Sequence, residues 1–157
     1  MATRAKDACD LLDAEHRAVK KMFRDYEELT GSRARSAAQK KMELARQICH
    51  ELTVHAQVEE EIFYPALREV MKDTDLLNEA EVEHGSVKDL IAQIEEMDEA
   101  DEMFHARVKV LGEYVDHHVK EERNEIFPKA RAARKLDLVA MRDELEARKE
   151  ELMAEVA

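Results

Sequence analysis

The stretch HAQVEEEIFYP, residues 55–65, returns later in the chain as HVKEERNEIFP, residues 118–128. In both copies a glutamate follows the histidine by four residues and a proline follows it by ten. A spacing of four places two side chains on one face of a helix. Each copy therefore presents an imidazole and a carboxylate together, and the repetition predicts two similar half-sites on two different helices.

The rest of the chain is predicted to be nearly all helix. It has only 3 Gly and 2 Pro among 157 residues and is rich in Ala, Glu, Leu, Lys and Arg, a composition typical of helical proteins. Pro65 should end or kink one helix near Tyr64, and Pro128 should close another. Short connections favour antiparallel neighbours. We expect helices over residues 6–29, 36–71, 76–97, 102–127 and 136–156.

These segments predict an all-α fold, an up-down-up-down four-helix bundle with an additional C-terminal helix. Residues 1–130 should form the bundle and residues 131–157 the added helix. The apolar side chains of that helix suggest packing against the bundle or against a partner chain, so a homodimer stays open. These side chains are Leu138, Met141, Leu145 and Leu152.

Each helix of the predicted bundle carries one histidine in its apolar stripe, at the 3.6-residue period of a helix. At 1.5 Å per residue from the nearest turn, the heights of the four histidines agree within about 6 Å. Independent core histidines would rarely coincide in this way. The four are His16, His55, His84 and His118, whereas His50, His105 and His117 lie off the inward faces and are predicted at the surface or its boundary.

Glu59 and Glu122 fall in the same layer as the four histidines. A buried carboxylate without a partner is costly, and neutral imidazoles compensate two anions poorly, whereas cations compensate them well. The alternative is a buried polar network without metal. Nitrogen and oxygen donors favour iron, manganese or zinc, bundle-core sites of this kind hold metal pairs, and the many histidines favour iron. We expect two Fe ions, bridged by an oxo or hydroxo group and by both carboxylates.

Together these segments resemble the hemerythrin-like HHE cation-binding family over residues 11–128. The resemblance implies a four-helix bundle with a non-haem di-iron centre. It also implies four terminal histidine ligands, His16, His55, His84 and His118, with Glu59 and Glu122 bridging the metals. The matching elements are LLDAEH ending at His16, His55-x-x-x-Glu59-Glu60 with Phe63-Tyr64-Pro65, Glu83-His84, and His118-x-x-x-Glu122 with Phe127-Pro128.

The chain departs from the oxygen-carrying hemerythrins at one position. They place a further histidine one turn after the ligand of the third helix, where this chain has Lys88; the departure argues against reversible oxygen carriage. Lys88 would either bring a cation near the open site or extend outward along the surface. Glu81 and Tyr114 are considered as additional ligands, and Glu51 as a hydrogen-bond partner of an imidazole N–H.

Charge and composition restrict the partners. The net charge of −12 repels nucleic acid and anionic membrane surfaces. No apolar run approaches the 18 residues of a membrane span, and the N-terminus has no apolar signal segment. Cys9 and Cys49 lack a metal-type spacing and are predicted as free thiols. We therefore expect a cytoplasmic protein without nucleic-acid or membrane partners.

Several functions are compatible with this site. The first expectation is binding or sensing of a small ligand such as dioxygen or nitric oxide. The alternatives are a di-iron enzyme acting on peroxide or another small oxidant, and an iron-homeostasis protein. No catalytic group beyond the predicted ligands is identified in the sequence, so whether the protein is an enzyme stays open at this point.

Overall fold

The structure consists of helices joined by short connections. The computed structural model describes residues 6–32 and 35–155, and no strand lies within them. The prediction of an all-α fold is confirmed. In chain order the elements are α1 (Ala8–Thr30), α2 (Ala37–Val58), η1 (Glu59–Phe63), α3 (Tyr64–Val70), α4 (Asp75–Glu95), α5 (Glu102–Glu121), η2 (Glu122–Ile126), α6 (Phe127–Ala132) and α7 (Leu138–Glu155).

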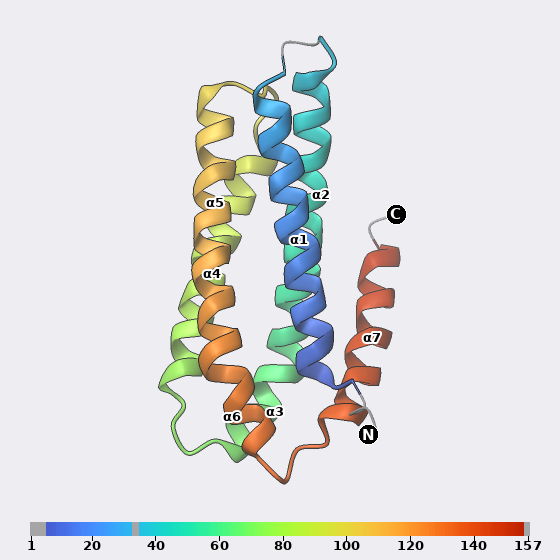
Figure 1. The fold of residues 1–157 in the computed structure, drawn as a ribbon, viewed down its shortest axis with the longest axis vertical. Coiled ribbons are helices and arrows are strands. Elements are labelled where there is room, and N and C mark those ends of the chain that lie inside the picture. The colour runs from blue at the N-terminus through green and yellow to red at the C-terminus, as the bar shows by residue number, and fades with distance from the viewer. Residues whose placement is uncertain (1–5, 33–34, 156–157) are drawn as a thin grey trace.

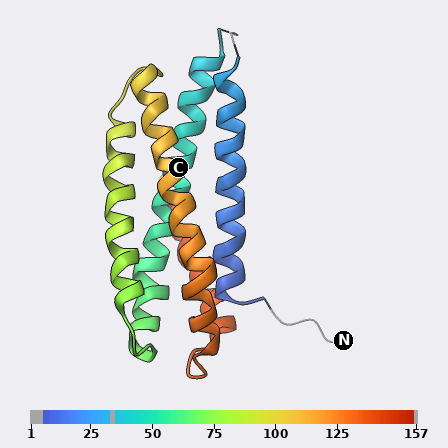
Figure 2. The ribbon, with the colours of Figure 1, turned by 60° about the vertical axis from the view of Figure 1, so that its left-hand side comes forward.

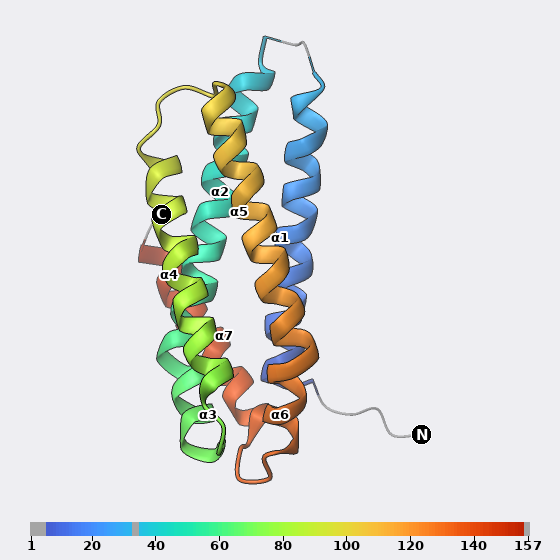
Figure 3. The ribbon, with the colours of Figure 1, turned by 90° about the vertical axis from the view of Figure 1, so that its left-hand side faces the viewer.

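Four long helices form the bundle, as predicted. α1, α2, α4 and α5 lie along the long axis of the molecule and alternate in direction (Figure 1). α1 packs against α2 and α5, and α4 packs against the same two helices. Figures 2 and 3 show the four helices from two further sides. Within the described ranges, no helix is apolar over enough of its length to cross a membrane.

Two of the bundle helices start at aspartates that cap them. The Asp7 carboxylate accepts a hydrogen bond from the Asp10 N–H at 3.0 Å, and the Asp10 carboxylate accepts one from the Asp7 N–H at 2.9 Å. Asp101 likewise accepts a hydrogen bond from the Phe104 N–H at 2.9 Å. Each such cap stabilises a helix by about 1 kcal/mol, which fixes where α1 and α5 begin.

Neither proline ends its helix. This is contrary to the prediction for Pro128; for Pro65 it removes one of the two predicted alternatives, an end or a kink. Each follows a single turn of π-helix, η1 or η2, and the chain continues as α3 or α6. The Tyr64 N–H bonds the carbonyl of Glu59, and the Phe127 N–H bonds that of Glu122, so both hydrogen bonds span five residues. A proline lacks an N–H and clashes with the preceding turn of an α-helix. The wider π-turn accommodates the ring, and the helix resumes beyond it.

The apolar core is divided by the layer of predicted site residues. One cluster fills the end of the bundle near η1 and η2 and includes Leu12, Phe63 and Ile126. The other lies toward the α1–α2 and α4–α5 turns and includes Ile48 and Phe104. Along each long helix the predicted histidine falls between members of the two clusters. Apolar side chains therefore pack above and below the layer of site residues along the bundle axis.

The C-terminal helix packs on its own bundle. α7 lies beside α1, α2 and η1 over part of their length (Figure 1). Its rim carries Arg148, which pairs with Glu61 at 2.7 Å, and Lys149, which pairs with Glu15 at 3.2 Å. Its four predicted apolar side chains are all buried: Leu138, Met141, Leu145 and Leu152.

Candidate metal centre

Six polar side chains from all four walls of the bundle meet in one buried layer. Glu59 and Glu122 are 0% exposed, and the four histidines are also buried. The histidines come one each from α1, α2, α4 and α5, and the glutamates are the first residues of η1 and η2. The residues that the structure brings together are His16, His55, Glu59, His84, His118 and Glu122.

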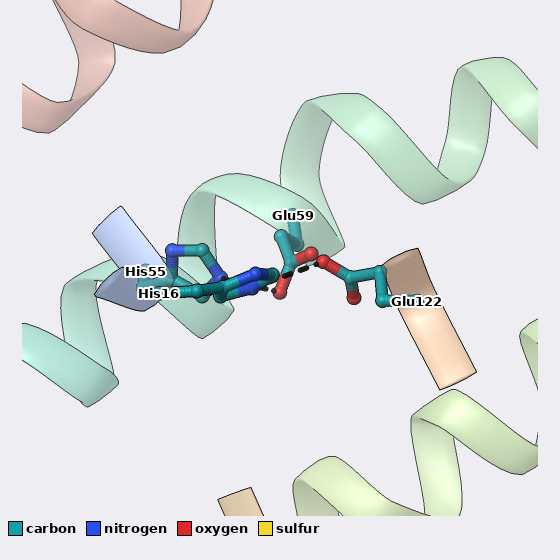
Figure 4. Close-up of side chains that lie close together, drawn as sticks. All are labelled: His16, His55, Glu59 and Glu122. Carbon is teal, nitrogen blue, oxygen red and sulfur yellow. Dashed lines mark hydrogen bonds and ion pairs between the residues drawn. The ribbon is translucent and has the colours of Figure 1, made fainter. Parts of the chain in front are cut away.

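One half of the cluster is built on α1 and α2. The Nε2 atoms of His16 and His55 lie 3.1 Å apart. His55 Nε2 lies 3.1 Å from Glu59 Oε1, and His16 Nε2 lies 3.3 Å from Glu122 Oε1. Figure 4 shows these four side chains pointing toward one another. The four donors therefore surround one small volume.

The other half repeats this arrangement on α4 and α5. The Nε2 atoms of His84 and His118 lie 3.1 Å apart. His84 Nε2 lies 3.4 Å from Glu59 Oε1, and His118 Nε2 lies 2.9 Å from Glu122 Oε2. Each glutamate thus contacts one histidine of each pair, which places both carboxylates between the two halves.

The donor set fits a pair of metal ions. Two donors held about 2.1 Å from one ion at right angles lie about 3 Å apart, which matches the spacing within each half. Oε1 of Glu59 and Oε1 of Glu122 are buried without a hydrogen bond, and such atoms are costly to leave unsatisfied. Cations between the facing nitrogens would satisfy both oxygens at once.

Outside the cluster, a carboxylate lies within hydrogen-bond distance of the second ring nitrogen of three of the four histidines. Such a partner holds the ring in place and leaves Nε2 free as a ligand. The contacts are Glu15 to His55 Nδ1 at 2.7 Å, Glu60 to His84 Nδ1 at 3.2 Å, and Glu83 to His118 Nδ1 at 3.3 Å. His16 is the exception, because its Nδ1 lies 3.7 Å from Asp13 and has no hydrogen-bond partner among the described residues. Sequence reasoning missed these carboxylates. The signal was present, because Glu15 and Glu83 each directly precede a histidine of the cluster.

Without metal, protons on the histidines balance the buried carboxylates. Burial lowers the pKa of His55, but Glu59 and Glu15 outweigh it and raise the pKa to about 10. Burial also opposes the charge of His118, yet Glu122 and Glu83 raise its pKa to about 11. Burial raises the pKa of Glu122, but its bonds to Glu59, His118 and His16 hold that pKa well below the usual range.

Tyr64 is a site residue whose role sequence reasoning missed. Its hydroxyl donates to Glu122 Oε2 at 2.5 Å and lies 3.3 Å from Glu59 Oε2. The same oxygen lies 3.3 Å from His118 Nε2 and 3.5 Å from His84 Nε2. Burial, followed by the charges of Glu122 and Glu59, raises the pKa of the phenol well above 10. Tyr64 is therefore a protonated phenol inside the α4–α5 half.

The two halves differ in the aromatic residue that follows each glutamate. Tyr64 follows Glu59 by five residues, and Phe127 follows Glu122 by five residues. The Phe127 ring stacks on His16 with centroids 6.1 Å apart, whereas the Tyr64 ring lies 5.4 Å from that of His84. The α1–α2 half consequently has an apolar ring where the α4–α5 half has a hydrogen-bond donor.

The structure does not bring the other considered residues into the cluster. Glu81 is exposed and pairs with Arg68 at 3.3 Å, and Tyr114 is 47% exposed. Both residues lie one helical turn from a histidine of the cluster, but their side chains point toward solvent. The carboxylate that contacts His55 Nδ1 is Glu15, and no contact of Glu51 with that ring is seen.

Lys88 follows the second of its two predicted alternatives. Its side chain is half exposed and its Nζ pairs with Glu60 Oε1. The other oxygen of Glu60 contacts His84 Nδ1. The lysine therefore extends outward and fixes a carboxylate behind His84, rather than bringing a cation to the open side of the cluster.

A cavity approaches the cluster between α1 and α5. Its volume is about 360 Å³, and its lining includes His16, Phe23, Val115 and Val119. Gly112 also lines it, and a Cβ at that position would lie 3.3 Å from the Phe23 ring. Glycine therefore leaves room for the ring where the two helices face each other. The cavity offers a small molecule a largely apolar approach to His16.

Known proteins share both the sequence pattern and the fold. The family model described as "Hemerythrin HHE cation binding domain" matches residues 7–130. A DNA nickase of Nostoc sp. is 30% identical over 118 residues, which are 75% of this chain. The chain spans about a third, 32%, of the length of that relative.

A solved structure is similar over nearly the whole chain. It is the crystal structure of a hemerythrin HHE cation binding domain-containing protein from Mycobacterium kansasii, with a TM-score of 0.76 and 21% sequence identity. The match covers 96% of this chain and 89% of that chain, so it includes the region of α7. At this identity the similarity shows a common fold.

Proposed function

Because the chain belongs to the hemerythrin HHE cation-binding domain family, we propose that it is a non-haem di-iron protein. His16 and His55 would hold one iron, His84 and His118 the other, with Glu59 and Glu122 shared between them. One observation carries the proposal: two pairs of Nε2 atoms face each other at 3.1 Å across two buried carboxylates. An oxo or hydroxo bridge would complete the centre.

The ligand we propose is a small molecule such as dioxygen or nitric oxide. Bound iron would supply a change of oxidation state and an open coordination position. The protein's own contribution is to bury the donors, to fix the rings of His55, His84 and His118 through their Nδ1 partners, and to admit a small ligand along the α1–α5 cavity. With a net charge of −12, the chain does not favour DNA as a ligand.

An enzyme acting on peroxide or another small oxidant is the second proposal, and Tyr64 favours it. The phenol oxygen lies 2.5 Å from Glu122 Oε2, inside the α4–α5 half of the cluster. A protonated group in that position can donate to a bound oxidant. Iron handling is less favoured, because the donors are buried and fixed by outer carboxylates, which oppose release.

The test begins with iron analysis of the purified protein, which we expect to contain two iron ions per chain. The protein is then reduced without oxygen and exposed to it while the optical absorption is recorded. A spectral change that reverses when oxygen is removed supports ligand binding. Irreversible oxidation together with turnover of added peroxide supports the enzyme. Absence of iron, with another metal or none, contradicts the di-iron proposal.

Metal loading should release protons at neutral pH. His55 and His118 have raised pKa values of about 10 and about 11, so both carry a proton at pH 7 in the metal-free protein. A metal ligand must be the bare Nε2, and binding therefore expels those protons. We expect release of about two protons per chain, measured with an indicator dye in weakly buffered solution. Loading without proton release would contradict these charge states.

Tyr64→Phe should weaken metal retention in the α4–α5 half. The change removes the hydroxyl that contacts Glu122 Oε2 and lies beside both rings of this half. Loss of a partner of this kind typically costs about 10- to 100-fold in metal affinity. Competition with a chelator measures the loss, and Tyr114→Phe is the matched control because that tyrosine is exposed. Equal release from both variants would exclude a role for Tyr64.

A further inference from the structure

A second His-x-x-x-Glu pair lies on the outer side of α5, one residue before the buried pair. His117 Nε2 lies 3.2 Å from Glu121 Oε1 on the same helix and 3.5 Å from Glu83 Oε2 on α4. One donor atom of each residue lies within 4.8 Å of the other two. Two rigid helices thus present an imidazole and two carboxylates to the same point.

In the other half of the pseudo-repeat, a lysine ammonium group occupies the equivalent point. In the other half, Glu15 contacts His55 Nδ1 through Oε1 and the ammonium group of Lys149 through Oε2. Glu83 is its counterpart and contacts His118 Nδ1 through Oε1. Its Oε2 faces His117 instead of a lysine.

The composition of the two halves accounts for the difference. The counterparts of His117 and Glu121 are Val54 and Val58, which are buried in the core cluster that also contains residues of α7. Within residues 6–32 and 35–155, no such helix covers the α4–α5 side (Figure 3). Among the ion pairs of the described residues, neither a lysine nor an arginine compensates Glu83 or Glu121.

We propose that Glu83, His117 and Glu121 form a third, surface site for a divalent transition-metal ion. One imidazole and two carboxylates are donors that Zn²⁺, Mn²⁺ and Fe²⁺ accept. His117 is 68% exposed in its side chain, so water can complete the coordination. The hollow around the site is also lined by Glu79, a further carboxylate. Through Glu83 the ion would be one carboxylate away from His118.

The experiment is a calorimetric titration with Zn²⁺ of the purified full chain as it is isolated. We expect the parent protein to bind one Zn²⁺ per chain more than His117→Ala or Glu121→Gln. His50→Ala is the matched control, because it also removes one non-core histidine but none of the metal-capable groups among the described residues includes His50. That control should bind as the parent does.

Two results would overturn the proposal: equal Zn²⁺ stoichiometry in the parent and both site variants, or the same loss in His50→Ala. Circular dichroism checks that the exposed substitutions leave the helices intact. The outcome is independent of the di-iron proposal, since the difference of one ion is read against whatever the buried cluster holds. Failure of the buried cluster to bind iron would leave this difference unchanged.

Discussion

Replacing Glu59 with alanine should remove both metal ions from the chain. Glu59 Oε1 lies 3.1 Å from His55 Nε2 and 3.4 Å from His84 Nε2, so one carboxylate serves both halves. Without it, only one carboxylate, that of Glu122, would lie between the two cations. Their repulsion would be poorly screened in this buried site. Metal analysis of the purified variant measures the loss.

The comparison with single-half variants sharpens this test. His55→Ala removes a donor from the α1–α2 half only, and we expect it to lose at least one ion. Glu61→Ala is the control, because this residue lies on the same π-turn but pairs with Arg148 at the surface. Full occupancy in Glu59→Ala would show that its carboxylate does not bridge, and loss of metal in Glu61→Ala would point to general damage of the turn.

Leu145→Ala should destabilise the folded protein by about 2–5 kcal/mol, the usual cost of emptying a leucine site in a well-packed core. Leu145 is 0% exposed and belongs to the core cluster that also contains Leu12 and Phe63. The change therefore leaves a cavity where α7 packs on the bundle. Chemical denaturation of parent and variant gives the free energies of unfolding.

Val139 provides the control on the same helix. Its side chain is 46% exposed, so Val139→Ala should change stability by no more than about 0.5 kcal/mol. A loss below 1 kcal/mol in Leu145→Ala would mean that α7 is not an integral part of the core. Metal content should stay unchanged in both variants, because neither side chain contacts the cluster.

Most of the fold could be predicted from the sequence, because the signals that mark a helix lie within the helix itself. The composition, the breakers and the 3.6-residue stripes predicted the four bundle helices to within a few residues at their starts, where Asp7 and Asp101 act as caps. The second helix was predicted to end at residue 71, and the helical path through η1 and α3 ends at Val70. The fourth was predicted to end at residue 127, but α6 carries it to Ala132. Pro65 and Pro128 were interpreted with the geometry of an α-helix, and a π-turn before each proline is not visible in apolar periodicity.

The same turn explains why Tyr64 was missed. In an α-helix, residues five apart lie about 140° apart around the axis, so Tyr64 and Glu59 would face different sides. The hydrogen bond from the Tyr64 N–H to the Glu59 carbonyl belongs to a wider turn, which brings both side chains to the cluster. The six predicted donors did not depend on this, because the turns from His55 to Glu59 and from His118 to Glu122 are still α-helical and the π-turns begin at the two glutamates.

The candidates Glu81 and Tyr114 failed for a different reason. Each lies one turn from a histidine, but the bundle core admits only a narrow stripe of each helix, and both side chains fall at its edge. The carboxylates that do contact the histidine rings reach across from neighbouring helices, as Glu15 and Glu83 do. Such contacts depend on which helices are neighbours. The periodicity of a single helix gives no information about its neighbours.

The two π-turns are places where the chain can change its length by one residue without changing which side chains face the cluster. A turn of π-helix holds about one residue more than a turn of α-helix, so deleting one residue between Glu59 and Tyr64 would let α2 and α3 join as a regular helix. The tyrosine would then follow Glu59 by four residues and would stay on the same face of the helix. A deletion elsewhere in α2 would instead rotate the residues beyond it by about 100°.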